Sequence, residues 1–95
     1  MKPGERVIWK YQLAADTFSV KDEVHLQIPE GFTLLSVAVR DGALCLWAQV
    51  DPSRPLVGKL IQIVGTGDPF KIPIRFLGTV VMKPFVWHVF ECAGP

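Results

Sequence analysis

The sequence has few cysteines and almost no net charge, and each of these shortages excludes a class of protein. Its two cysteines, Cys45 and Cys92, fit none of the multi-cysteine patterns of disulfide-stapled domains or zinc sites. We therefore expect two reduced thiols that pack as small apolar side chains. The net charge is +1, with acidic and basic residues interspersed. The chain thus lacks the excess of basic residues that binds a long nucleic acid or an anionic membrane.

Long apolar runs are also missing. No segment approaches the roughly 20 consecutive apolar residues that a transmembrane helix needs. The first residues, MKPGERVIWKYQL, contain no apolar signal-peptide core. We read residues 1–5 as a loose leader, and we expect a cytoplasmic protein.

Short alternating segments separated by turn residues fill the 95 residues and predict one all-β domain, residues 1–95. The predicted strands are 6–13, 24–28, 33–40, 43–50, 57–64, 75–82 and 85–91. Residues 14–20 are the best candidate for a short helical turn or a loop, and residues 70–74 are expected to run extended. The expected architecture is a small antiparallel β-sandwich or barrel of about seven strands.

The clearest prediction is a hairpin over residues 33–50 with Asp41-Gly42 as its type I′ turn. A two-residue turn places Val39 opposite Leu44. The face that we expect in the core holds Leu35, Val37, Val39, Leu44, Leu46 and Ala48. The opposite face is mixed and carries Leu34, Ser36, Ala38, Cys45, Trp47 and Gln49. Because side chains alternate along a strand, we expect Trp47 to lie outside the main core.

Two further local features carry predictions. Both faces of the segment 85–91 are apolar, so we expect this strand to be central in its sheet or at an interface. Gly58 interrupts the strand 57–64 and indicates a β-bulge.

Tryptophans are the most informative candidates for a binding surface. An indole such as Trp47, on a sheet face outside the core, is typical of an interface anchor or of a platform on which a ring can stack. The alternative is a second small core beneath the Pro-rich connections. Apolar residues make up 49% of the chain, which is more than a small monomer readily covers, so we expect a homo-oligomer or a partner surface.

The loop Gly65-Thr66-Gly67-Asp68 is a candidate for anion binding, because glycines let backbone amides approach a ligand closely. Pro69 follows it and no helix does, so a plain turn is the simpler interpretation. An exposed arginine pairs well with phosphate. The candidate ligand site comprises Trp47, Trp87, Gly65, Thr66, Gly67, Arg40 and Arg54.

The sequence offers little for catalysis or metal binding. His25 and His88 lie on different predicted strands with no third ligand at recognisable spacing. A nucleophilic pair of His88 with Cys45 or Cys92 stays open, because such pairs are spatial rather than sequential. We predict no catalytic residue, no metal and no cofactor, and we expect His88 to be a hydrogen-bonded core or interface residue.

Several short motifs are distributed along the chain: Trp9-Lys10-Tyr11, Leu35-Ser36-Val37, Leu46-Trp47-Ala48 with Val50-Asp51-Pro52, Gly65-Thr66-Gly67, and FVWHVF at residues 85–90. With these motifs the chain resembles a family of small proteins encoded by tailed phages and bacterial prophages. The motifs span nearly the whole chain, and the family is a domain of unknown function. The resemblance implies a phage or prophage origin, and hence the cytoplasm of an infected bacterium, but it implies no catalytic residues.

Our leading function hypothesis is a non-enzymatic accessory binding protein. In this hypothesis it is a counter-defence module that sequesters a nucleotide-like signalling ligand or blocks a host protein, by analogy with small phage β-proteins that act as nucleotide sponges. One alternative is a structural or assembly protein whose apolar surface only makes oligomer contacts. The other alternative is a small enzyme.

Overall fold

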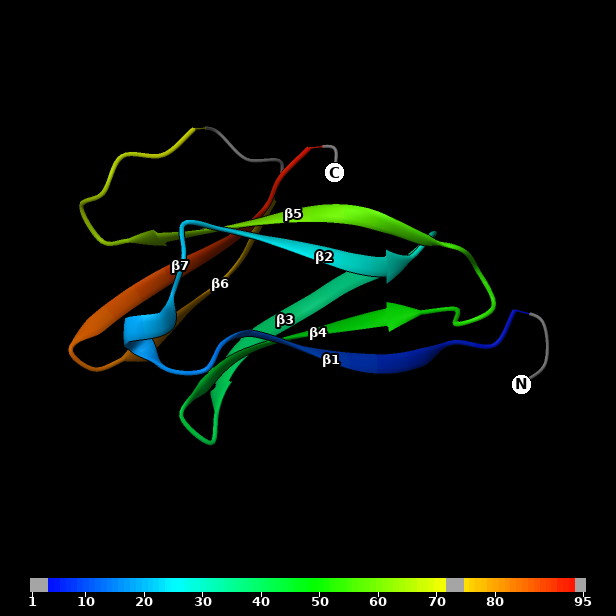
Figure 1. Ribbon diagram of the computed structural model, residues 1–95, viewed down its shortest axis with the longest axis horizontal. Helices are drawn as coiled ribbons and strands as arrows, with labels where there is room; N and C mark the ends of the chain where they lie inside the picture. The colour runs from blue at the N-terminus through cyan, green and yellow to red at the C-terminus, as the bar shows by residue number, and fades with distance from the viewer. Residues whose placement is uncertain (1–3, 72–74, 94–95) are drawn as a thin grey trace.

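The computed structural model describes residues 4–71 and 75–93, and these confirm the all-β fold (Figure 1). The elements are β1 (Val7–Ala14), the 3-10 turn η1 (Thr17–Ser19), β2 (Glu23–Pro29), β3 (Thr33–Arg40), β4 (Ala43–Val50), β5 (Leu56–Gly65), β6 (Arg75–Met82) and β7 (Phe85–Glu91). The strands form two antiparallel sheets, ordered β1-β4-β3 and β2-β5-β7-β6. The predicted leader and the predicted extended segment 70–74 lie partly outside the described residues.

The hairpin turn adopts the predicted conformation. Asp41 and Gly42 have φ angles of 52° and 80°, the left-handed geometry that a type I′ turn requires. Val39 lies opposite Leu44, so the register predicted from the turn is confirmed over the first part of the hairpin. The 3-10 turn η1 likewise lies within the segment predicted as a helical turn or a loop, and the Asp16 side chain accepts hydrogen bonds from the amides of Phe18 and Ser19.

The predicted register is wrong in the outer part of the hairpin. A shift between Leu34 and Ser36 places Leu34, rather than Leu35, opposite Ala48. Leu34 is 1% exposed whereas Leu35 is 41% exposed. The extra residue of a bulge reverses which side chain faces inward, so Leu34 supplies the core contact that we expected from Leu35.

The core fills the space between the two sheets. The central strand β4 contributes Leu44, Leu46 and Ala48, each 0% exposed. β7 lies between β5 and β6, and this central place confirms the prediction for residues 85–91. Figure 1 shows β4 between β1 and β3, with β1 at the edge of its sheet.

The bulge predicted at Gly58 is wrong. Gly58 lies opposite Gln27 in an uninterrupted β2–β5 ladder. A register shift occurs instead between Phe76 and Gly78 on β6, where the strand passes close to β3. The bulge therefore follows a close approach between sheets, which the local sequence around residue 58 does not specify.

Candidate functional site

Trp47 lies on the outer face of the three-stranded sheet, as the hairpin alternation predicts. Its neighbours Leu46 and Ala48 are 0% exposed, whereas Trp47 is half-buried and stands outside the hydrophobic cluster of the described residues. Because consecutive side chains on a strand point to opposite faces, the indole points away from the core. The ring is therefore placed where a second molecule can reach it.

A cation and a hydroxyl flank the Trp47 indole. Lys10 on β1 and Ser36 on β3 are its direct cross-strand partners, one on each neighbouring strand. Residues directly opposite in antiparallel strands have Cβ atoms about 4.5–5.5 Å apart. Both partners are exposed, so an ammonium group, an indole and a hydroxyl form one row across the sheet.

The outer face that holds this row is positively charged. Strands β1, β3 and β4 contain no aspartate or glutamate, and their charged residues are Lys10 and Arg40. Outer-face positions are occupied by Ile8, Lys10, Gln12, Thr33, Ser36, Ala38, Arg40, Ala43, Cys45, Trp47 and Gln49. A flat ring beside a cation and polar side chains is the arrangement that stacks a base and pairs with a phosphate.

Trp87 has a different environment from Trp47. It packs against the hydrophobic core, and its Nε1–H donates a hydrogen bond to the Thr17 hydroxyl over 3.0 Å. Gly65 lies directly opposite it, and a Cβ at Gly65 would stand 3.3 Å from the Trp87 Cζ3 atom. The structure thus brings Trp87 together with the glycine loop and places Trp47 on the other sheet.

The glycine loop is a hydrogen-bonded turn. The Asp68 amide donates to the Gly65 carbonyl over 3.0 Å. The Thr66 hydroxyl lies 2.8 Å from Nε2 of His88, and the Thr79 hydroxyl lies 2.9 Å from its Nδ1. The prediction that His88 is hydrogen-bonded is therefore confirmed. An anion at this loop would displace the Thr66 bond and meet the Asp68 carboxylate, so the plain-turn interpretation fits the geometry better.

The two candidate arginines lie at opposite ends of β4. Arg40 is opposite Ala43 beside the hairpin turn, on the same outer face as Trp47 and about 13 Å along the strand from it. Arg54 follows the other end of β4 and forms an ion pair with Glu30. Of the seven candidate residues, only Trp47 and Arg40 share this face.

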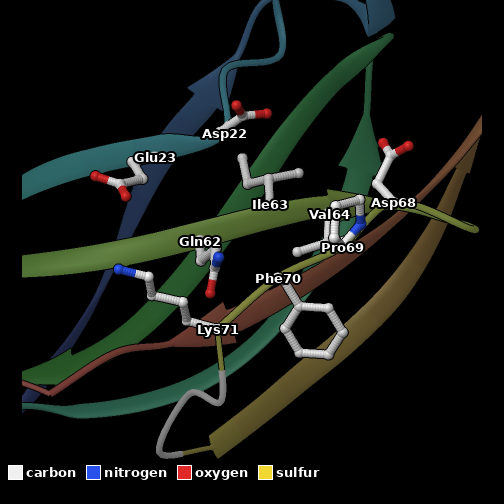
Figure 2. A pocket seen from close by; sticks show the side chains of 9 residues that line it. All are labelled: Asp22, Glu23, Gln62, Ile63, Val64, Asp68, Pro69, Phe70 and Lys71. Atoms are coloured by element: carbon white, nitrogen blue, oxygen red, sulfur yellow. The ribbon is translucent and has the colours of Figure 1, made fainter.

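A groove with a volume of about 620 Å³ lies between the start of β2, the end of β5 and the following loop (Figure 2). Figure 2 shows Gln62 on the same side of β5 as Phe70, with Ile63 pointing the opposite way. The charged residues that line the groove are Asp22, Glu23, Asp68 and Lys71. Carboxylates outnumber the ammonium group, so the groove repels an anionic ligand.

Neither thiol has the environment of a nucleophile. Cys45 and Cys92 are free cysteines, as predicted. Burial, followed by the charge of Glu23, raises the pKa of Cys92, and a raised thiol pKa lowers the thiolate fraction. Both ring nitrogens of His88 bond threonine hydroxyls rather than a thiol. Within residues 4–71 and 75–93, no group of three or more His, Cys, Asp and Glu side chains is placed to hold a metal.

Lys10 is the candidate that the sequence reasoning did not place. Its position beside Trp47 depends on the pairing of β1 with β4, two strands that are far apart in the sequence. The lack of acidic residues in β1, β3 and β4 does not indicate this pairing, because β5 and β6 lack them as well.

In the described part of the chain, no helix has the length and apolar character needed to cross a membrane.

Comparisons with known proteins identify a family and give no functional relative. No curated protein and no solved structure matches this chain significantly. A family model described as "Domain of unknown function (DUF7352)" matches residues 4–95, and the chain therefore belongs to this family.

Proposed function

We propose that the protein is a non-enzymatic binding module of phage or prophage origin that captures a nucleotide-like anionic ligand on the outer face of β1, β4 and β3. The observation that carries this proposal is the cross-strand row of Lys10, Trp47 and Ser36 on a face without carboxylates. Sequestering such a ligand would serve a counter-defence role without any catalytic group.

Two residues of the row have distinct tasks in this proposal. The Trp47 indole stacks on the base, and the Lys10 ammonium group meets a phosphate. Base stacking on an aromatic side chain contributes about 1–3 kcal/mol, and a hydrogen bond to a charged group about 1.5–3 kcal/mol. Together they reach about 2.5–6 kcal/mol, which corresponds to dissociation constants of about 40 µM to about 15 mM. One copy of the row is thus a weak binder of a mononucleotide.

Isothermal titration calorimetry with a panel of mono-, di- and cyclic nucleotides tests the proposal. We expect saturable binding that Trp47→Ala and Lys10→Ala each weaken about tenfold or more, because each removes one of the two main contacts. Lys71→Ala is the matched control, since it removes an exposed lysine from the acidic groove and should leave affinity unchanged. The absence of binding across the panel, or equal affinity in Trp47→Ala, would overturn the proposal.

A second candidate function, an assembly component, rests on a different surface. Phe18 on η1 is 79% exposed and Val81 on β6 is 61% exposed. Phe18 also makes an edge contact with Phe85, with 6.2 Å between ring centroids. If this patch holds an assembly together, Phe18→Ser should abolish association while nucleotide binding persists, and size-exclusion chromatography reads the result.

A further inference from the structure

Strand β1 is an edge strand of the three-stranded sheet in the described part of the chain. Within the described residues β1 pairs only with β4. On this strand Ile8 is 56% exposed and Trp9 is 37% exposed, while the neighbouring β4 is almost wholly buried. An edge strand presents unpaired backbone N–H and C=O groups and is a template for another strand.

Ile8 and Trp9 point to opposite faces of the sheet. Ile8 lies opposite Gln49 on the outer face, and Trp9 lies opposite the fully buried Ala48 on the inner face. A molecule docked on one face would cover one of these side chains and leave the other in water. A strand added at the edge carries side chains on both faces and covers both.

The edges of the other strands are occupied differently. β3 packs against β6, where a Cβ at Gly78 would stand 2.7 Å from a Val37 methyl group. On β2 the Gln27 carbonyl accepts a hydrogen bond from the Tyr11 hydroxyl over 3.3 Å. Among the described residues, β1 has a stretch without a partner on its outer edge, from Val7 to the bulge that follows Gln12.

We propose that β1 pairs antiparallel with β1 of a second copy of this chain about a twofold axis at Trp9, which joins two three-stranded sheets into one. Residues that lie opposite each other in two paired strands point to the same face of the sheet. The twofold axis must therefore lie between one residue and the same residue of the second copy. An axis at Lys10 would set two lysines opposite each other, and an axis at Ile8 would set Lys10 opposite Arg6. Like charges directly opposite are destabilising, whereas an axis at Trp9 sets Lys10 opposite Ile8.

The joined sheet carries a composite site, an inference that rests on the proposed function. Its outer face holds two Trp47 indoles separated by three strand spacings across the sheet and by two residues along it, about 16 Å in all, with both Lys10 side chains between them. This arrangement fits a ligand that has two rings outside and two negative charges near a twofold axis. A dinucleotide with two bases and two phosphates has that chemistry. The second copy supplies a second stacking contact and a second cation, which a single weak row lacks.

Sedimentation-velocity ultracentrifugation without ligand tests the interface. We expect a dimer for the wild-type chain and a monomer for Ile8→Lys, because the new lysine at position 8 lies opposite Lys10 of the second copy. The double variant Ile8→Lys/Lys10→Glu should restore the dimer, since the facing pair then has opposite charges. Leu56→Lys, at a comparably exposed apolar site on β5, is the control and should stay dimeric. Circular dichroism should show an unchanged fold in every variant.

Two outcomes overturn the interface: a monomeric wild-type chain over a wide concentration range, or a folded Ile8→Lys chain that remains dimeric.

Titration with a cyclic dinucleotide then tests the composite site, for which we expect one ligand per two chains. One ligand per chain, bound by a monomer, would overturn the composite site and leave the proposed function standing. A dimer that binds no nucleotide would overturn the proposed function and leave the interface standing.

Discussion

Gly78 on β6 and Val37 on β3 approach each other so closely that a Cβ at position 78 would lie 2.7 Å from the Val37 Cγ2 atom. The two residues belong to different sheets, so this contact closes the molecule along β3 and β6. Because β3 is thereby covered, β1 is the edge of the three-stranded sheet that stays open.

Gly78→Ala should destabilise the fold by about 1–3 kcal/mol, because the added methyl group overpacks the β3–β6 contact. Urea unfolding monitored by circular dichroism measures the loss. Combining it with Val37→Ala should recover part of the loss, since the smaller side chain makes room. Simple additivity of the two single variants would contradict this account of the contact.

Trp87→Phe should cost about 1 kcal/mol of stability, because it removes the hydrogen bond to the buried Thr17 hydroxyl. Nucleotide affinity should stay the same, since Trp87 packs against the core and away from the proposed binding face. Thermal unfolding and calorimetric titration of the same sample measure both quantities. A loss of affinity with unchanged stability would place the ligand near Trp87 instead.

Glu91→Gln should destabilise the fold by about 1–3 kcal/mol, because it leaves a nearly buried ammonium group without its anion. Lys59 Nζ lies 3.2 Å from the Glu91 carboxylate, and their side chains are 11% and 16% exposed. Glu30→Gln is the matched control, since the Glu30–Arg54 pair is about half exposed and such pairs contribute about 0–1 kcal/mol. Equal losses in the two variants would contradict the prediction.

Acid should remove a contribution to stability that comes from Asp51. Hydrogen bonds from the Ser53 hydroxyl and amide, helped by the charge of Arg6, lower the pKa of Asp51 in the folded chain below its usual 3.8. The contribution is therefore complete above that ordinary value and is lost as the pH falls through the lower folded pKa. Asp51→Asn should flatten the acid limb of a stability–pH curve. Asp41→Asn, at the exposed hairpin turn, is the control for the chemical change from carboxylate to amide.

The fold could be predicted from the sequence wherever a local rule determines it. Asp41-Gly42 fixes both a turn and a register, and alternation marks each strand. The bulge at Leu35 could not be predicted, because Leu34 and Leu35 are equally apolar and either one satisfies the local pattern. Packing between distant strands decides which leucine is buried. The same reason explains why the close approach falls at Gly78 and why Gly58 pairs regularly.

The candidate site was predicted only in part for the same physical reason. The orientation of Trp47 follows from the hairpin alone, so its place on the outer face was predictable. Its neighbour Lys10 comes from a strand far away in the sequence, and no local pattern states which strands pair. Trp87, Arg54 and the glycine loop were grouped with Trp47 by residue type, and the structure places them elsewhere.

A fluorescence titration of a chain that retains only one of its three tryptophans tests the central claim most directly. The variant Trp9→Phe/Trp87→Phe keeps the indole at position 47, and we expect its emission to change saturably with a cyclic dinucleotide as the base stacks on the ring. The variant Trp9→Phe/Trp47→Phe should show no change. A flat signal from the Trp47 chain together with a saturable signal from the Trp87 chain would contradict the account.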